Sequence, residues 1–250
     1  MDEAKKNEDG IPPIVATYRL ARRTFHHKAA GDIPANINKL KTLMDGLKSE
    51  DLGLDRTLTD PATWTDPLGP PYKVIQLYDD PEVDMFILVL RPGFTLPLHD
   101  HPHMHGLLKV ISGSANVVSF SKFSKQEKND LSFAVRAKHK MACLAQGFKK
   151  RRLFAKVSQD GIQQENDQTS ILTPTTSNYH KIEALDAPVA FLDVLAPPYD
   201  THIEGIGPRI CRYYKVANTL SNGVVELRET STPVSTVNYD NVPYLGPKLF

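Results

Sequence analysis

The sequence predicts a mainly β protein in which one closed β-structure follows a short helical region. Of its 250 residues, 40% are hydrophobic and 24% charged, which is typical of a soluble globular chain able to bury a core. Beyond Pro61, short β-branched runs bounded by turn residues replace helical periodicity, and most of the 19 prolines lie there. No repeat recurs with a period of about 20–50 residues, which argues against solenoids and propellers.

The N-terminal region carries the helical signal. Between Pro34 and Leu52, apolar residues recur at steps of three and four, the pattern of an amphipathic helix with one buried face: Ile37, Leu40, Leu43, Met44 and Leu47. Val15 to His26 is a second, less regular candidate helix. We therefore predict an N-terminal helical extension, residues 1–55, packed on a barrel domain of residues 56–250.

The rest of the chain supplies the strands. Candidate strands are Lys73–Tyr78, Met85–Arg91, Leu107–Ile111, Ala115–Phe120, Leu153–Val157, Tyr179–Ala184, Val189–Leu195, Ile210–Val216 and Val224–Arg228. Residues 121–169 are polar and lysine-rich, and we interpret them as a long insertion. Its basic run, residues 149–152, fits a solvated loop better than a contact for an acidic partner.

Composition limits the classes of binding partner and the cellular compartment that we expect for this chain. The formal net charge of +1 gives no reason to expect nucleic acid or an anionic membrane as a partner. Two cysteines argue against a disulfide-stapled scaffold and fit a reducing compartment. The N-terminus has no signal-peptide pattern, and no apolar stretch approaches the ~20 residues that span a bilayer. We expect a soluble, cytoplasmic monomer.

Four of the nine histidines fall within residues 99–105, at the end of a probable strand. Side chains alternate along a strand, so His99 and His101 point to one face and can converge on one ion. Pro102 interrupts this alternation, which leaves His103 and His105 less surely on that face. For His26, His27, His139 and His202 we expect ordinary surface or core positions.

The surrounding glycines resemble the first motif of the cupin barrels, G-x5-H-x-H-x3-4-E-x6-G. Five residues separate Gly93 from His99, and six separate Gly106 from Gly113. Gly106 stands where the motif has its glutamate ligand, so a third ligand must come from elsewhere. His180 lies in a later candidate strand, where the second cupin motif contributes its histidine. Three histidines and a water would equally suit a catalytic zinc.

Longer strings resemble the cysteamine dioxygenase (2-aminoethanethiol dioxygenase) and plant cysteine oxidase family. They are residues 99–110 (HDHPHMHGLLKV), 191–200 (FLDVLAPPYD), 211–214 (CRYY) and 243–248 (PYLGPK). The resemblance runs from about Asp51 to the C-terminus apart from the insertion. It implies a cupin double-stranded β-helix, a jelly-roll barrel, in which Fe(II) on three histidines uses O2 to convert a thiol into a sulfinic acid.

Carried over to this sequence, the resemblance gives His99, His101 and His180 as iron ligands, with Asp193 and Tyr199 close to the substrate. Cys211 and Tyr213 match a pair that can cross-link in the cysteamine dioxygenase branch, although simple packing of the pair is an equal alternative. Asp193 interrupts an apolar strand, so it either binds a substrate amine or orients a ligand histidine. Tyr199 follows two prolines and either donates to O2 or the substrate, or only packs.

The chemistry suits these residues. Three neutral imidazoles leave the charge of Fe(II) uncompensated, which favours binding a thiolate and leaves room for O2. No arginine lies in the histidine motifs to hold the carboxylate of free cysteine, which favours cysteamine or the N-terminal cysteine of a peptide as substrate. In the second role, the enzyme would couple O2 availability to protein turnover. The alternatives are a non-enzymatic metal-binding cupin acting as a regulatory or scaffold module, and a zinc or manganese isomerase or hydrolase.

Overall fold

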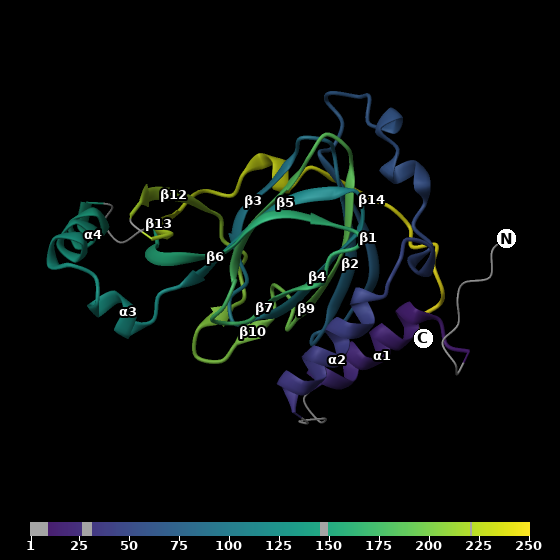
Figure 1. The fold of residues 1–250 in the computed structure, drawn as a ribbon, viewed down its shortest axis with the longest axis horizontal. Coiled ribbons are helices and arrows are strands. Elements are labelled where there is room, and N and C mark those ends of the chain that lie inside the picture. Colours follow the sequence, from purple (N-terminus) through teal and green to yellow (C-terminus); the bar gives the residue numbers. More distant parts are fainter. Residues whose placement is uncertain (1–9, 27–31, 146–149, 221) are drawn as a thin grey trace.

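The computed structural model describes residues 10–26, 32–145, 150–220 and 222–250. Two six-stranded, largely antiparallel sheets face each other and form the barrel (Figure 1). The first sheet has the order β14-β1-β2-β9-β4-β7, with β1 (Tyr72–Asp79), β2 (Asp84–Leu90), β4 (His105–Ser112), β7 (Ser170–Leu172), β9 (Val189–Ala196) and β14 (Tyr239–Asn241). The second has the order β12-β13-β6-β5-β8-β3, with β3 (Thr95–Asp100), β5 (Ser114–Lys122), β6 (Arg152–Gln164), β8 (Tyr179–Ala184), β12 (Tyr214–Thr219) and β13 (Val224–Glu229). The predicted cupin barrel is confirmed.

Helices cover one face of the first sheet. They are α1 (Pro13–Phe25) and α2 (Ile33–Asp45), and they lie side by side against that sheet in Figure 1. Short 3-10 helices span Glu50–Leu52, Arg56–Thr59, Pro61–Thr63 and Val234–Thr236. Asp32 caps α2 by accepting a hydrogen bond from the Ala35 backbone N–H at 3.1 Å. Both predicted helices are present, although the one expected between Pro34 and Leu52 ends at Asp45 and a separate 3-10 turn follows at Glu50–Leu52. The division of the chain at residue 55 stays a prediction.

Strand alternation separates an outer core from an inner one. In β9, Leu192 and Val194 pack with the helices, whereas Val189 and Phe191 point between the two sheets. Asp193 is the next inward position after Phe191, because side chains alternate along a strand. The barrel interior is therefore apolar at one end and carries a carboxylate toward the other.

The region predicted as an insertion contains a long strand. Strand β6 pairs with β5 from Ala155 opposite Lys122 to Gln164 opposite Ser114. Its second half alternates partly buried and exposed residues, so its polar composition reflects a solvated outer face and not a loop. Only the preceding part leaves the barrel, as α3 (Lys125–Asn129) and α4 (Phe133–Ala145), which protrude at the left of Figure 1.

One predicted strand is wrong over half its length, and some short ones were missed. Ile210–Val216 becomes regular only at Tyr214, because the preceding residues run past β3, where the Arg212 backbone N–H donates to the Asp100 carboxylate at 2.8 Å. The strands β7, β14, β10 (His202–Ile203) and β11 (Gly207–Pro208) were not predicted from the sequence. No helix among the described residues is long and apolar enough to cross a membrane.

Candidate metal centre

Three buried histidines meet inside the barrel. His99 lies in β3 directly opposite His180 in β8, and His101 follows the end of β3. The potential ligand atoms of the three side chains lie within 4.8 Å of one another, and the His101 and His180 Nε2 atoms are 3.1 Å apart. The structure thus brings together the three residues that the sequence selected.

Hydrogen bonds outside the cluster fix which ring nitrogens face inward. The Nδ1–H of His99 donates to the Pro97 carbonyl at 2.7 Å, which leaves its Nε2 lone pair available. The Tyr199 hydroxyl donates to the Asp100 carbonyl at 2.7 Å and accepts from His101 Nδ1–H at 2.9 Å. The Nε2 of His101 therefore also presents a lone pair, and it faces His180.

Burial keeps these imidazoles neutral. Desolvation lowers the pKa of His99 to about 4. Desolvation, followed by the neighbouring imidazoles, lowers the pKa of His101 and of His180 well below the usual value. At neutral pH the cluster carries no charge of its own, and its nitrogens are free to act as ligands.

The cluster fits a metal ion. Two lone pairs that face each other at 3.1 Å repel unless a proton or a cation lies between them. Two nitrogens bound at right angles to one metal with bonds of ~2.1 Å would be ~3.0 Å apart, close to the observed separation. No carboxylate of the described residues joins the cluster. At the motif's glutamate position, a Cβ on Gly106 would lie 2.9 Å from side-chain atoms of Leu172 and Leu195, so a larger residue there would require these leucines to move.

The motif glycines have a backbone role. Gly93 and Gly113 adopt positive φ angles of 70° and 80°, which glycine tolerates best. A Cβ on Gly113 would also lie 2.4 Å from the Pro188 carbonyl oxygen. Gly113 forms the one-residue turn between β4 and β5, and Gly93 precedes the strand that carries His99.

A cavity of about 540 Å³ opens beside the cluster, with His99 and His101 in its wall. Asp193 also lines it and is only 5% exposed. Burial, and then the charge of Asp84, raise the pKa of Asp193 to about 8. Burial likewise raises the pKa of Asp84 to about 6, although this carboxylate accepts a hydrogen bond from Gln76 Nε2 at 2.7 Å. Asp84 and Gln76 carried no sequence signal, because single polar residues in or next to a strand are common.

The remaining predicted residues share this wall. Tyr199, Cys211 and Tyr213 all line the cavity. The Cys211 thiol lies beside the hydroxyl groups of both tyrosines, and burial raises its pKa to about 11. Burial, followed by the Cys211 charge, raises the pKa of Tyr213 to about 12. Cys211 and Tyr213 are therefore neighbours in the cavity wall, as both the cross-linked and the packed alternative require.

Two further polar residues support the histidine strand. Asp100 is 3% exposed and accepts hydrogen bonds from the Arg212 backbone N–H and, at 2.9 Å, from the Tyr214 hydroxyl. Asn178 donates to the His101 carbonyl at 2.7 Å. Asp100 follows His99 by one residue, and Asn178 precedes His180 by two. This closeness to the histidines is the only indication of their role in the sequence.

The other histidines lie elsewhere. His105 packs near Phe25 of α1, outside the barrel, with ring centroids 6.0 Å apart. His103 occupies a turn with φ 58°, His26 lies 3.2 Å from Glu82, and His202 is exposed. His139 departs from the expectation of an ordinary position, because it lies between Glu226 and Cys143. His27 is outside the described residues.

The fold and the site together define a cupin barrel with a three-histidine centre able to hold a metal ion. The chain belongs to the PCO_ADO family, whose model matches residues 43–249. The family resemblance predicted from the sequence is thereby confirmed.

The named relatives span most of the chain. The 2-aminoethanethiol dioxygenases of Homo sapiens and Mus musculus are 29% and 30% identical to it, over 87% and 92% of this chain and 82% and 95% of theirs. Plant cysteine oxidase 1 of Arabidopsis thaliana is 28% identical, over 82% of this chain and 64% of its own. Among solved structures, the Schizosaccharomyces pombe Cnp3 cupin domain aligns with 53% of this chain and 69% of its own at 10% identity, with a TM-score of 0.33.

Proposed function

We propose that this protein is an iron(II)-dependent thiol dioxygenase that adds both atoms of O2 to the sulfur of an amine-bearing thiol and forms a sulfinic acid. The observation that carries the proposal is a cluster of three neutral histidines, with no described carboxylate among them, beside a cavity that holds the buried Asp193. The family membership of the chain supports the same reaction.

The ligand set is the reason for choosing a thiol as the substrate. His99, His101 and His180 would hold the iron through neutral nitrogens and leave its charge uncompensated. When bound, iron(II) supplies Lewis acidity that lowers the pKa of a thiol and the electrons that make O2 reactive. The leucines beside Gly106 lie within 2.9 Å of where a Cβ at the motif's glutamate position would stand.

The cavity supplies recognition of an amine. Three carboxylates line it, from Asp84, Asp193 and Asp200, and none of the described residues in its wall is Lys or Arg. A substrate ammonium would draw Asp193 into its ionised form by offsetting the cost of burial. In this proposal Asp193 accepts hydrogen bonds from that ammonium, whereas the carboxylate of free cysteine would find no cation.

Tyr199 has a positioning role in this proposal. Its hydroxyl is already engaged by His101 and the Asp100 carbonyl, so it holds a ligand imidazole in place. The cross-link between Cys211 and Tyr213 stays a prediction. It would form a thioether by removing the thiol hydrogen and one ring hydrogen, with O2 as the oxidant, and would lower the intact mass by two hydrogens.

The size of the cavity bears on the substrate. About 540 Å³ lies in the range of pockets that hold drug-sized ligands and exceeds what cysteamine fills. Tyr239 and Ile210, in its wall, are 44% and 45% exposed, so the cavity reaches the surface. We therefore propose that the N-terminal cysteine of a peptide is accepted along with cysteamine. The cytoplasmic location and the monomeric state stay predictions.

The test is to load the protein with Fe(II) without oxygen, add cysteamine or a Cys-initiated peptide, admit O2 and measure the mass of each thiol. We expect a gain of two oxygen atoms, with kcat/KM higher for the peptide. An N-acetylated peptide is the matched control, because it keeps the thiol and lacks the ammonium. Equal oxidation of the acetylated peptide would contradict amine recognition, and no oxidation of any thiol by iron-loaded protein would contradict the reaction.

A further inference from the structure

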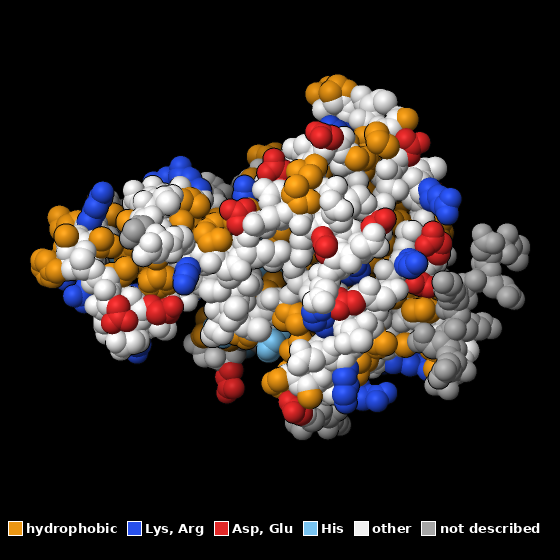
Figure 2. Space-filling view, in the orientation of Figure 1, with side chains coloured by type: hydrophobic (Ala, Val, Ile, Leu, Met, Phe, Trp, Pro, Cys, Tyr) orange, Lys and Arg blue, Asp and Glu red, His pale blue; other side chains and the backbone are white. Residues whose placement is uncertain are grey.

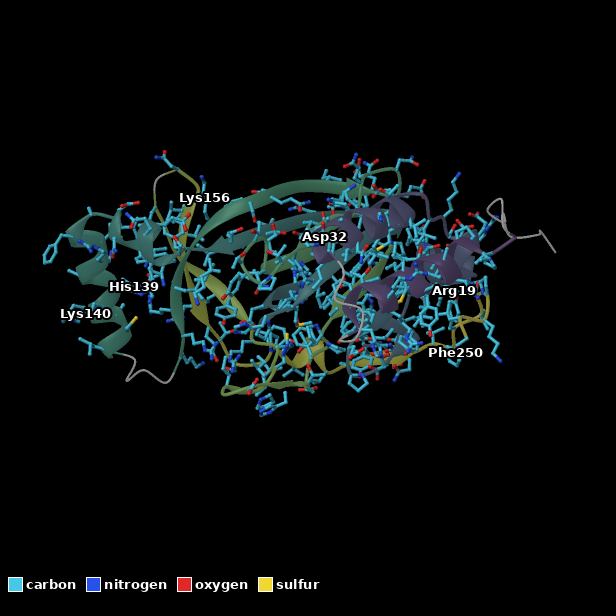
Figure 3. All side chains as sticks on the ribbon, turned by 90° about the horizontal axis from the view of Figure 1, so that it is seen from below. Arg19, Asp32, His139, Lys140, Lys156 and Phe250 are labelled. Carbon is cyan, nitrogen blue, oxygen red and sulfur yellow. The ribbon has the colours of Figure 1, made fainter. Side chains whose placement is uncertain are left out.

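A second group of reactive side chains lies outside the barrel, where α4 packs beside β13. Figure 3 labels His139 on α4. His139 Nδ1 lies 2.6 Å from Glu226 Oε1, and His139 Nε2 lies 3.6 Å from Cys143 Sγ, one helical turn further along. The His139 ring also packs against Phe154, with ring centroids 4.4 Å apart. A thiol, an imidazole and a carboxylate are thus arranged in a row.

The Glu226 carboxylate determines which ring nitrogen of His139 carries the proton. Glu226 is 4% exposed, and hydrogen bonds from His139, Asn218 and Arg152 overcome the effect of burial and lower its pKa below the usual value. An ionised Glu226 accepts from Nδ1–H, so Nε2 carries the lone pair and accepts from the Cys143 thiol. This is the relation between a nucleophile, a base and an orienting acid that activates cysteine in enzymes.

The thiol borders a basic cavity. A cavity of about 360 Å³ is lined by Cys143 and by five cationic side chains: Lys122, Lys128, Lys150, Arg151 and Arg152. None of the described residues in its wall is acidic. Arg152 is paired with Glu226 at 2.9 Å. Within the described part of the chain, no carboxylate forms an ion pair with the other four. Figure 2 shows several Lys and Arg side chains on this part of the molecule.

Of the basic run predicted as a solvated loop, residues 150–152 line this cavity, and residue 149 lies outside the described residues. Lys122 comes from the end of β5 and Lys128 from α3, so elements far apart in sequence converge with Arg151. Burial is the main reason why the pKa of Lys122 is lowered, and repulsion from Lys128 and Arg151 adds to the effect. A bound anion would relieve that repulsion.

We propose that Cys143 is a modification site, at which this thiol exchanges with a small anionic disulfide captured by the basic cavity. His139 takes the proton of Cys143, and the resulting thiolate attacks one sulfur of the disulfide. A new sulfur–sulfur bond forms, the bond of the reagent breaks, and the leaving thiolate takes the proton from His139. The protein thiol is oxidised as half of the reagent is reduced, so no other oxidant is needed.

Each feature of the cluster has a part in this reaction. Burial, followed by the charge of Glu226, raises the pKa of the Cys143 thiol, so the thiol depends on a base. Cys143 is partly exposed and accessible to a reagent. Glutathione disulfide is a suitable probe, because its carboxylates outnumber its amino groups and the cavity is large enough for one of its halves.

The experiment follows the rate of mixed-disulfide formation by mass spectrometry with peptide mapping, using glutathione disulfide and the neutral bis(2-hydroxyethyl) disulfide. We expect Cys143 to react at least about tenfold faster with the anionic reagent, and the double variant Lys150→Glu/Arg151→Glu to abolish that preference. Lys156→Glu, on β6 and outside the cavity, is a charge-reversal control and should retain the preference. His139→Gln should slow both reagents by on the order of 100-fold.

Two results would overturn the proposal. One is modification of Cys143 with no preference for the anionic reagent. The other is an unchanged rate in His139→Gln, with far-UV circular dichroism showing that the variant is folded. Cys211, the other free cysteine, is the internal reference, because it lies in the barrel cavity away from the basic cluster.

Discussion

The barrel and the α4 region place histidines in opposite settings. Inside the barrel, His99 and His101 donate Nδ1–H to a carbonyl and a hydroxyl, and no carboxylate of the described residues forms a hydrogen bond or ion pair with them. On α4, His139 donates to the ionised Glu226. Burial keeps the barrel imidazoles neutral and the hydrogen bonds at Nδ1 turn Nε2 toward the cluster, whereas the carboxylate at His139 holds Nδ1–H and turns Nε2 toward a thiol. The residue type is the same, and the surroundings of the ring decide its chemistry.

The largest expected effect is the loss of a ligand. His180→Ala removes one of the three converging nitrogens and should lower activity at least about 1,000-fold with loss of bound iron. His105→Ala is the matched control, because His105 belongs to the same sequence cluster but packs outside the barrel against Phe25. Metal analysis of the purified variants checks both. Full iron content in His180→Ala would remove this residue from the ligand set.

The next effect concerns the carboxylate in the barrel. The pKa of Asp193 is raised from 3.8 to about 8, so between these values the folded state holds a proton that the unfolded state has released. Stability must then fall as pH rises through this window. Urea unfolding of the metal-free protein should show that Asp193→Asn gains on the order of 3 kcal/mol relative to the wild type between pH 5 and 7. A pH-independent difference would contradict the burial of this carboxyl group.

Tyr199→Phe tests the hydroxyl that orients a ligand. The substitution removes the acceptor for His101 Nδ1–H and leaves the ring in the cavity wall. We expect a loss of about 10- to 100-fold in iron affinity, measured by anaerobic titration. Unchanged affinity with reduced turnover would instead assign the hydroxyl to the substrate or O2.

The smallest effect concerns the position of the missing glutamate. Gly106→Ala places a methyl group 2.9 Å from Leu172 and Leu195, which should cost about 1–3 kcal/mol in the free energy of unfolding. Gly161→Ala is a suitable control, because a Cβ there meets no atom within 4 Å. Equal stability of the two variants would show that the leucines yield easily and that a carboxylate could be accommodated.

Local sequence patterns predicted those features of the site that depend only on residues close together in the chain. Strand alternation was enough to put His99 and His101 on one face, and glycine spacing marked the turns around them. His180 depended on family resemblance, because its position opposite His99 is set by the pairing of β3 with β8 across about 80 residues. The solvated face of β6 concealed a central strand, since its polar residues look like those of a loop.

Contacts between residues far apart in the chain could not be predicted from the sequence. The bond from Tyr199 to His101 depends on how the chain after β9 returns over the end of β3. The cluster on α4 joins His139 to Glu226, 87 residues away. One-dimensional patterns carry no information on such pairs, and the sequence therefore left His139 among the ordinary histidines.

The central claim is that three neutral histidines hold an iron that oxygenates an amine-bearing thiol. The most direct measurement is the mass of a Cys-initiated peptide after reaction with the iron-loaded protein under ¹⁸O2. The account predicts a sulfinic acid that carries two ¹⁸O atoms. A product with oxygen from water, or an unmodified peptide in the presence of fully loaded iron, would contradict it.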